Sequence, residues 1–218
     1  MTGMPHSPDV LRDLIATTAT RLGPDAPTLC DPWTVRDLLG HLVVRESRVD
    51  ALPGVGLPVP ALQRHTQRLQ DRAAGRAFDE LVETVRGGPA PWWPTRLRAV
   101  DRAVNTAELS IHLEDMARAQ PGWEPTPLPA ATQEQLWGTL RSTGRLLYRS
   151  APCGVVAVAP GHGRVPLRRP PEGTGSVVLT GAPLELLLHA FGRERVARVE
   201  AEGAQRDLDA LARHRRGA

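Results

Sequence analysis

Two side chains near the middle of the sequence, Glu108 and His112, have types and a spacing that suit metal binding. In an α-helix, residues i and i+4 lie one above the other on the same face, so both side chains can point at one small object. Neutral imidazole and carboxylate are ordinary ligands of zinc and related divalent metals. Two ligands do not complete a site, so a metal centre requires a third ligand elsewhere in the chain.

The helix that must position this pair is expected over residues 99–119. Its apolar side carries Ile111 and Met116, and Glu108 and His112 lie along the edge of the same stripe. A buried and unpaired charge is costly, so an inward-facing Glu108 needs a cation or a proton. An exposed Glu108 bonded to His112 or to an arginine fits the same spacing. Periodicity alone leaves these two interpretations even.

A histidine on an earlier helix, His41, is the candidate third ligand. Thr34 and Asp37 have the spacing of a helix-capping pair, and the neighbours Leu38 and Leu42 turn His41 inward. A single histidine on an apolar face is more often a core residue with a hydrogen-bonded ring than a ligand. The presence of an inward-facing Glu108–His112 pair shifts the balance toward a ligand.

The composition is that of a soluble globular protein, with 218 residues, 41% hydrophobic and 23% charged. No apolar run approaches the ~20 residues of a membrane span, and the first residues lack a signal-peptide pattern, so we expect a cytoplasmic protein without a membrane partner. The calculated pI is 9.6 although the net charge is only +3, because every basic residue other than histidine is arginine. Arginines alternate with acidic residues along the chain, so we expect no nucleic-acid partner.

The pattern of the chain predicts two domains, 1–150 and 151–218. The first is expected to be helical, with antiparallel neighbours that suit a four-helix bundle. Its helices are expected over residues 7–22, 35–46, 61–85 with an interruption near Gly75, 99–119 and 129–149. The second is expected to be a small α+β domain with strands near 154–159, 164–168, 175–181 and 195–200, and helices near 182–192 and 204–213.

A proline-framed aromatic pair, Trp92 and Trp93, follows the breaker-rich segment 87–91. The two indoles could form the wall of a pocket that binds a cofactor. Simple packing against the helices fits the sequence equally well.

Two stretches, Trp33–Val43 and Asn105–His112, resemble the maleylpyruvate isomerase family of mycothiol-dependent, DinB-like metalloproteins. The resemblance extends to the tail, where residues 177–181 and 184–188 look like the small C-terminal domain of that family, and it spans nearly the whole chain. The strongest match is to short bacterial members described as metal-binding proteins of unknown function.

The resemblance implies a mainly α fold, a DinB-like four-helix bundle followed by the small C-terminal domain. It also implies that a metal is held by a histidine of the second helix and a Glu-x-x-x-His pair, which fall here on His41, Glu108 and His112. Two histidines and one carboxylate leave a coordination position open, as in catalytic zinc sites. A thiol with an intrinsic pKa near ~8.5 is mostly protonated at neutral pH, and coordination to a divalent metal deprotonates it.

We therefore expect a zinc-dependent (Zn²⁺) transferase or isomerase that activates a low-molecular-weight thiol such as mycothiol for attack on an electrophilic small molecule. Arg45, one turn from His41, is a candidate for binding an acidic group or for orienting Glu46, and both are assigned to the catalytic site. Two alternatives stay open. One is a metal-binding interaction protein without catalytic activity, for which a homodimer is one form. The other is a hydrolase that uses a metal-activated water.

Three further residues carry weaker hypotheses. Asp115 lies three residues beyond His112 and could orient that ligand, or could form a surface salt bridge with Arg118. Cys30 and Cys153 have no metal-binding spacing. Cys30 has no neighbouring base in sequence and Cys153 lies at the start of the second domain, so both are interpreted as structural thiols.

Overall fold

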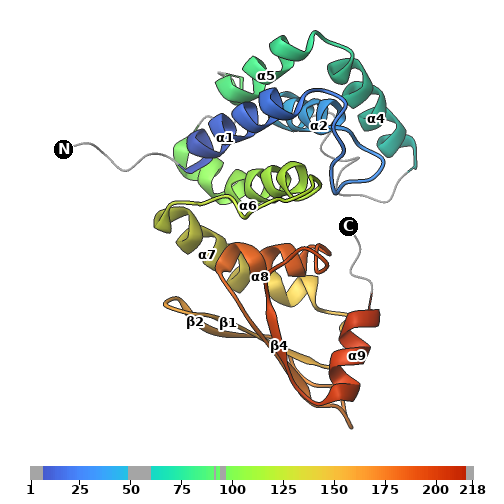
Figure 1. The fold of residues 1–218 in the computed structure, drawn as a ribbon, viewed down its shortest axis with the longest axis vertical. Helices are drawn as coiled ribbons and strands as arrows, with labels where there is room; N and C mark the ends of the chain where they lie inside the picture. The colour runs from blue at the N-terminus through green and yellow to red at the C-terminus, as the bar shows by residue number, and fades with distance from the viewer. Residues whose placement is uncertain (1–6, 49–59, 91, 94–96, 215–218) are drawn as a thin grey trace, which may run out of the picture. The chain divides into compact units, whose positions relative to one another are not determined.

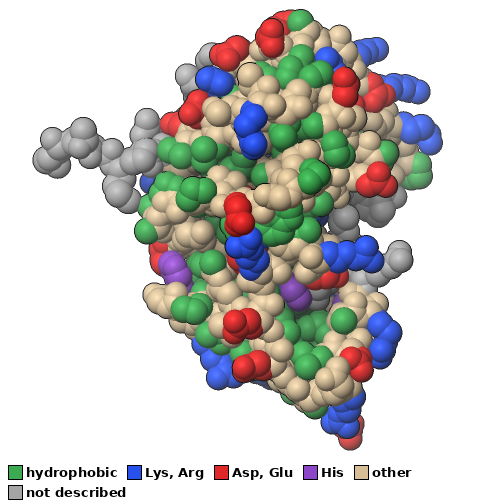
Figure 2. All heavy atoms as spheres, viewed as in Figure 1, with side chains coloured by type: hydrophobic (Ala, Val, Ile, Leu, Met, Phe, Trp, Pro, Cys, Tyr) green, Lys and Arg blue, Asp and Glu red, His purple; other side chains and the backbone are tan. Residues whose placement is uncertain are grey.

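The computed structural model describes residues 7–48, 60–90, 92–93 and 97–214. These residues form two compact units, which meet in the sequence between Pro127 and Leu128. Within the described residues, no helix is both long enough and apolar enough to cross a membrane. Side chains of both charges are interspersed with apolar ones on the face shown in Figure 2.

The N-terminal unit is built from helices (Figure 1). They are α1 (Ser7–Leu22), α2 (Val35–Ser47), α4 (Pro60–Ala74), α5 (Phe78–Gly87) and α6 (Arg98–Ala117). Helix α1 packs against α5 and α6, and α2 packs against α4 and α5. The core that these helices share is aliphatic, with fully buried Leu11, Ile15, Leu38, Leu109 and Met116. The interruption expected near Gly75 is confirmed, since it separates α4 from α5.

Two local features determine where helix α2 begins and how closely α4 packs against it. Thr34 and Asp37 form a complete capping box, as their spacing predicts. Gly40 lies where a β-carbon would stand 3.1 Å from the backbone oxygen of Gln70 and 3.1 Å from the backbone nitrogen of Ala74. The absence of a side chain at Gly40 therefore lets α4 approach α2 closely, next to His41.

The C-terminal unit combines a small mixed sheet with three helices among the described residues. The helices are α7 (Ala130–Leu147), α8 (Pro183–Ala190) and α9 (Gln205–Arg213), and the strands are β1 (Gly154–Ala159), β2 (Gly163–Arg168), β3 (Ser176–Thr180) and β4 (Glu200–Glu202). The strand order is β2-β1-β3-β4, with β1 and β3 parallel and the other two pairs antiparallel. The mainly helical fold with a small α+β tail is thus confirmed.

Two sequence-based boundaries differ from the structure. The helix that was expected to end the first domain, α7, packs against α8 and β2 and so belongs to the C-terminal unit. The strand expected over 195–200 is wrong, because residues 193–197 form a turn in which Val196 and Ala197 donate backbone hydrogen bonds to Arg193. The last strand begins only at Glu200.

Candidate metal centre

Helices α2 and α6 bring His41, Glu108 and His112 together. Oε1 of Glu108 lies 3.4 Å from Nε2 of His41 and 3.2 Å from Nε2 of His112. One ligand atom from each residue falls within a group whose atoms are all within 4.8 Å of one another. Both histidines are buried, and the Glu108 side chain is 29% exposed. The carboxylate therefore faces the two rings, with one side accessible.

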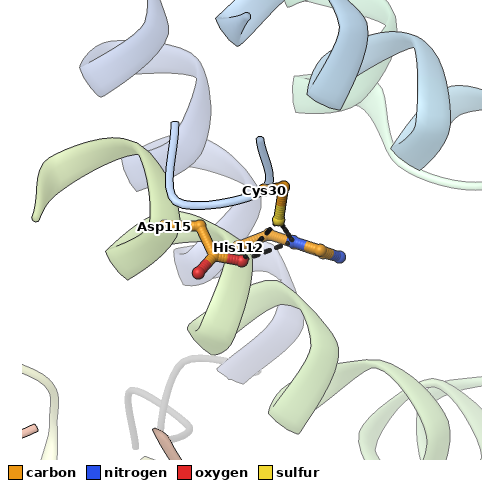
Figure 3. A group of neighbouring side chains, drawn as sticks. All are labelled: Cys30, His112 and Asp115. Carbon is orange, nitrogen blue, oxygen red and sulfur yellow. Dashed lines mark hydrogen bonds and ion pairs between the residues drawn. The ribbon is translucent and has the colours of Figure 1, made fainter. Parts of the chain in front are cut away.

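The partners of His112 fix its ring orientation (Figure 3). Its Nδ1 lies 3.0 Å from Oδ2 of Asp115, which is fully buried, while Nε2 points the opposite way. A carboxylate that accepts the Nδ1 proton is the usual outer partner of a metal-bound histidine. The hypothesis that Asp115 orients His112 agrees with this geometry, and the alternative of a surface salt bridge is wrong because Asp115 is buried.

Cys30 completes the group in Figure 3 from the loop between α1 and α2. Its thiol donates to Oδ2 of Asp115 at 3.1 Å, and Sγ lies 3.9 Å from Nδ1 of His112. The loop is attached to α6 at the same point, since the backbone nitrogen of Leu29 donates to the backbone oxygen of Asp115. Cys30 thus supports the residue that holds His112, which agrees with a structural role for this thiol.

His41 is held by two neighbours. Its Nδ1 lies 2.9 Å from the side-chain amide of Gln70 on α4, and the Trp33 ring lies against it with centroids 5.1 Å apart. With the Gln70 nitrogen toward the ring, the imidazole proton sits on Nε2 and can be donated to Glu108. A half-turn of the amide presents its oxygen instead, which keeps the proton on Nδ1 and leaves the Nε2 lone pair for a cation.

The electrostatics of the group favour a positive charge between the rings. Burial raises the pKa of Glu108, but hydrogen bonds with His112 and His41 and the charge of Arg45 outweigh it and hold that pKa well below its ordinary range. Burial lowers the pKa of His41. Burial also opposes a charged His112, yet its hydrogen bonds with Asp115, Cys30 and Glu108 raise its pKa. Glu108 is therefore ionised at neutral pH and attracts a proton or a metal cation.

The two residues assigned to catalysis have different surroundings. Nε of Arg45 lies 3.3 Å from Oε1 of Glu108, and its Nη1 donates to the side-chain oxygen of Asn105. Glu46 is buried in an ion network with Arg12 of α1, at 2.5 Å, and its Oε1 accepts from the Asn105 amide at 3.0 Å. Arg45 thus contacts the candidate site directly, and Glu46 is linked to it through Asn105.

The tryptophan pair is split between surface and core. The side chain of Trp93 is buried, whereas Trp92 is 67% exposed, and the rings meet edge to face with centroids 5.4 Å apart. Trp92 is available to a ligand and Trp93 packs in the protein.

Several site residues escaped the sequence interpretation. Cys30, Gln70 and Asn105 contact the site through tertiary packing between a loop and α6, between α4 and α2, and between α6 and α2. None of these contacts has a fixed spacing in sequence. The one available signal was the position of Asn105 one turn before Glu108 on the same helix.

The donor set and its spacing fit a divalent metal. Zinc bonds of about 2.0–2.2 Å at tetrahedral angles separate two ligand atoms by about 3.3–3.6 Å. The separations from Oε1 of Glu108 to the two ring nitrogens, 3.4 Å and 3.2 Å, lie within about 0.1 Å of this range. Imidazole and carboxylate are ligands that zinc accepts, so the residues present suit such an ion.

Comparison with solved structures places the fold. The chain is similar to the crystal structure of the mycothiol-dependent maleylpyruvate isomerase, with a TM-score of 0.53 and 17% identity over 91% of this chain and 93% of the other. A crystal structure of a histidine-to-alanine mutant of that enzyme gives a TM-score of 0.57 and 16% identity over the same shares. The protein thus has the fold of mycothiol-dependent maleylpyruvate isomerase. No family model matches the sequence, and no curated protein matches it significantly.

Proposed function

We propose that this protein is a zinc-dependent enzyme with a DinB-like helical bundle that activates a low-molecular-weight thiol, such as mycothiol, for transfer to or isomerisation of an electrophilic small molecule. The observation that carries the proposal is the convergence of His41, Glu108 and His112 at separations that suit metal ligands. The likeness of the fold to a mycothiol-dependent isomerase supports the choice of thiol.

The chemistry follows from the number of protein ligands. Three ligands leave a position on the metal for an external molecule, which is the arrangement of catalytic rather than structural zinc sites. A divalent metal bound there supplies the charge that keeps a thiol deprotonated at neutral pH, where a free thiol is mostly protonated.

The chain's own residues orient and neutralise this site. The carboxylate of Asp115 lies against Nδ1 of His112, and the side-chain amide of Gln70 lies against Nδ1 of His41, so each ring is held through its Nδ1. Arg45 fixes the Glu108 carboxylate, and since its side chain is 16% exposed it also presents positive charge to an acidic substrate. Glu46 acts through Asn105 on the position of Arg45, so we assign it a positioning role.

The exposed indole of Trp92 is the member of the tryptophan pair that we assign to binding of the thiol. Its flat apolar face suits the carbon skeleton of a bulky cosubstrate.

The test is a zinc-binding measurement joined to a thiol-conjugation assay. The wild-type protein should bind one zinc ion per chain and consume mycothiol in the presence of an electrophile. Glu108→Ala and His112→Ala should lose most of the zinc binding and most of the mycothiol consumption. Glu80→Ala, which removes an exposed carboxylate from α5, should keep both the zinc binding and the mycothiol consumption. Zinc binding without any thiol reaction would contradict the enzymatic proposal, and hydrolysis in place of conjugation would favour an activated water.

A further inference from the structure

The C-terminal unit contains a hollow of about 360 Å³ that is surrounded by arginines. It lies where the C-terminal part of α7 and the turn after it meet β2, two elements that pack together. Its lining consists of Arg145, Arg149, Pro166, Leu167, Arg168 and Arg169. Four of these six residues carry a positive charge and none carries a negative one.

These charges lack carboxylate partners in the part of the chain that the structure describes. No described aspartate or glutamate forms an ion pair with Arg145, Arg149, Arg168 or Arg169. Arg145 near the end of α7 and Arg149 in the turn after it both line this hollow, so two like charges face the same small volume. An anion in the hollow would reduce the repulsion between them.

The strongest single sign of a missing partner is Arg168. Its Nε is buried and has no acceptor among the described residues. Its Nη1 donates to the backbone oxygen of Arg149, and Nη1 of Arg149 donates to the backbone oxygen of Leu146 at 3.1 Å. These bonds hold both guanidinium groups in place. A buried N–H without an acceptor is costly and uncommon, because more than nine in ten buried polar groups find a partner.

We propose that this hollow is a binding site for a small molecule that carries phosphate groups. The planar fork of arginine matches the oxygens of a phosphate and forms two hydrogen bonds at once, which explains a cluster of arginines better than a generic basic surface does. A volume of about 360 Å³ lies within the range of small-ligand pockets, and Leu167 supplies an apolar wall for the rest of such a ligand.

The hollow and the candidate metal centre share no residue. Its residues belong to the C-terminal unit, whereas His41, Glu108 and His112 belong to the N-terminal unit. The cluster comes from residues 135–171, a stretch with six arginines and no acidic residue. The charge balance over the whole chain does not single out this local excess, and the packing of α7 on β2 gathers four of the six arginines at the hollow.

The test is isothermal titration of the full-length protein, without added zinc because phosphates themselves bind this metal, with inorganic pyrophosphate and with a nucleoside diphosphate, using the uncharged nucleoside as the reference ligand. The phosphate-bearing ligands should bind and the nucleoside should not. Arg168→Gln and, separately, Arg145→Gln should weaken binding by about tenfold or more, because each removes a charge-assisted hydrogen bond.

Arg141→Gln is the matched control, since Arg141 lies on α7 one turn before Arg145, is exposed and does not line the hollow. It should leave the affinity within about twofold, because Arg141 does not line the hollow and an exposed charge without a direct contact to the ligand contributes little. Arg145 is exposed, so its variant remains informative even if Arg168→Gln fails to fold.

Three results would overturn the proposal: no binding of either phosphate ligand, equal weakening by all three variants, or binding of a single-stranded oligonucleotide without binding of pyrophosphate.

Discussion

Asp115 is the residue on which the orientation of His112 depends most directly. Its carboxylate accepts from Nδ1 at 3.0 Å and from the Cys30 thiol at 3.1 Å, in a fully buried position. Removal of such an outer partner costs a metal site about 10- to 100-fold in affinity or activity, because the ring loses its fixed tautomer and direction.

We therefore predict that Asp115→Ala lowers zinc affinity by about 10- to 100-fold without removing a ligand. Competition with a chromophoric chelator measures the affinity. Asp71→Ala, which removes an exposed carboxylate from α4, is the control and should have no effect. An unchanged affinity in Asp115→Ala would show that His112 is not held through Asp115 when it binds metal.

Contacts between residues that are close in sequence could be predicted from helical spacing. The pairing of Glu108 with His112, and of His112 with Asp115, follows from helical spacing of four and three residues. His41 lies 67 residues from Glu108, so periodicity could not select it as a partner, and the family resemblance did. Cys30 was interpreted as lacking a neighbouring base, and the structure supplies His112 and Asp115 from 82 and 85 residues away.

At the scale of elements, a buried ion network joins three helices behind the candidate site. Arg12 of α1 lies 2.5 Å from Glu46 of α2 and 2.6 Å from Asp101 of α6, and all three are at most 5% exposed. The Asn105 amide donates to both carboxylates, and Asn105 accepts from Arg45, which contacts Glu108. The network therefore fixes the relation between the helices that carry the candidate ligands.

Removal of Arg12, which pairs with both carboxylates, should lower the stability of the fold strongly. We predict that Arg12→Met destabilises the protein by about 3–5 kcal/mol, because Glu46 and Asp101 are left buried without that counter-charge. Urea unfolding followed by circular dichroism measures the change. Arg21→Met, at the exposed end of the same helix, should change stability by less than about 0.5 kcal/mol.

Recovery of part of the lost stability in the double variant Arg12→Met, Glu46→Gln would show that the cost comes from unpaired charge. A single Arg12→Met variant as stable as the wild type would mean that the network adds nothing to the fold.

The network also shows why the sequence could not distinguish the surroundings of Glu46 from those of Arg45. Its neighbour Arg45 faces Glu108, while Glu46 lies toward α1 and is bound by Arg12. Adjacent residues on a helix point in different directions, so a motif that includes both cannot say which one reaches the site. Glu46 is drawn away from the site by Arg12 of α1, and the position of α1 relative to α2 depends on tertiary packing that the local sequence does not specify.

At the scale of the whole molecule, the change in composition near residue 151 marks where strands begin, not where the units divide. An amphipathic helix such as α7 carries an apolar stripe whichever unit buries it, so its sequence cannot say that it packs against α8 and β2. The order of elements and the mixed α+β tail were predictable, because strand and helix periodicities differ. The mixed strand order β2-β1-β3-β4 depends on long-range pairing and was not predicted.

We propose that an external thiol enters the open position of a metal held by His41, Glu108 and His112. Cobalt(II) in place of zinc makes this visible, because a thiolate bound to cobalt gives an intense near-ultraviolet charge-transfer absorption. We predict that mycothiol produces this band in the cobalt-loaded wild type and in Cys30→Ser, and fails to do so in Glu108→Ala and His112→Ala. A band that is present before thiol is added and is lost in Cys30→Ser would assign the metal to the protein's own thiol. Cobalt binding with no thiol-dependent band would contradict this proposal.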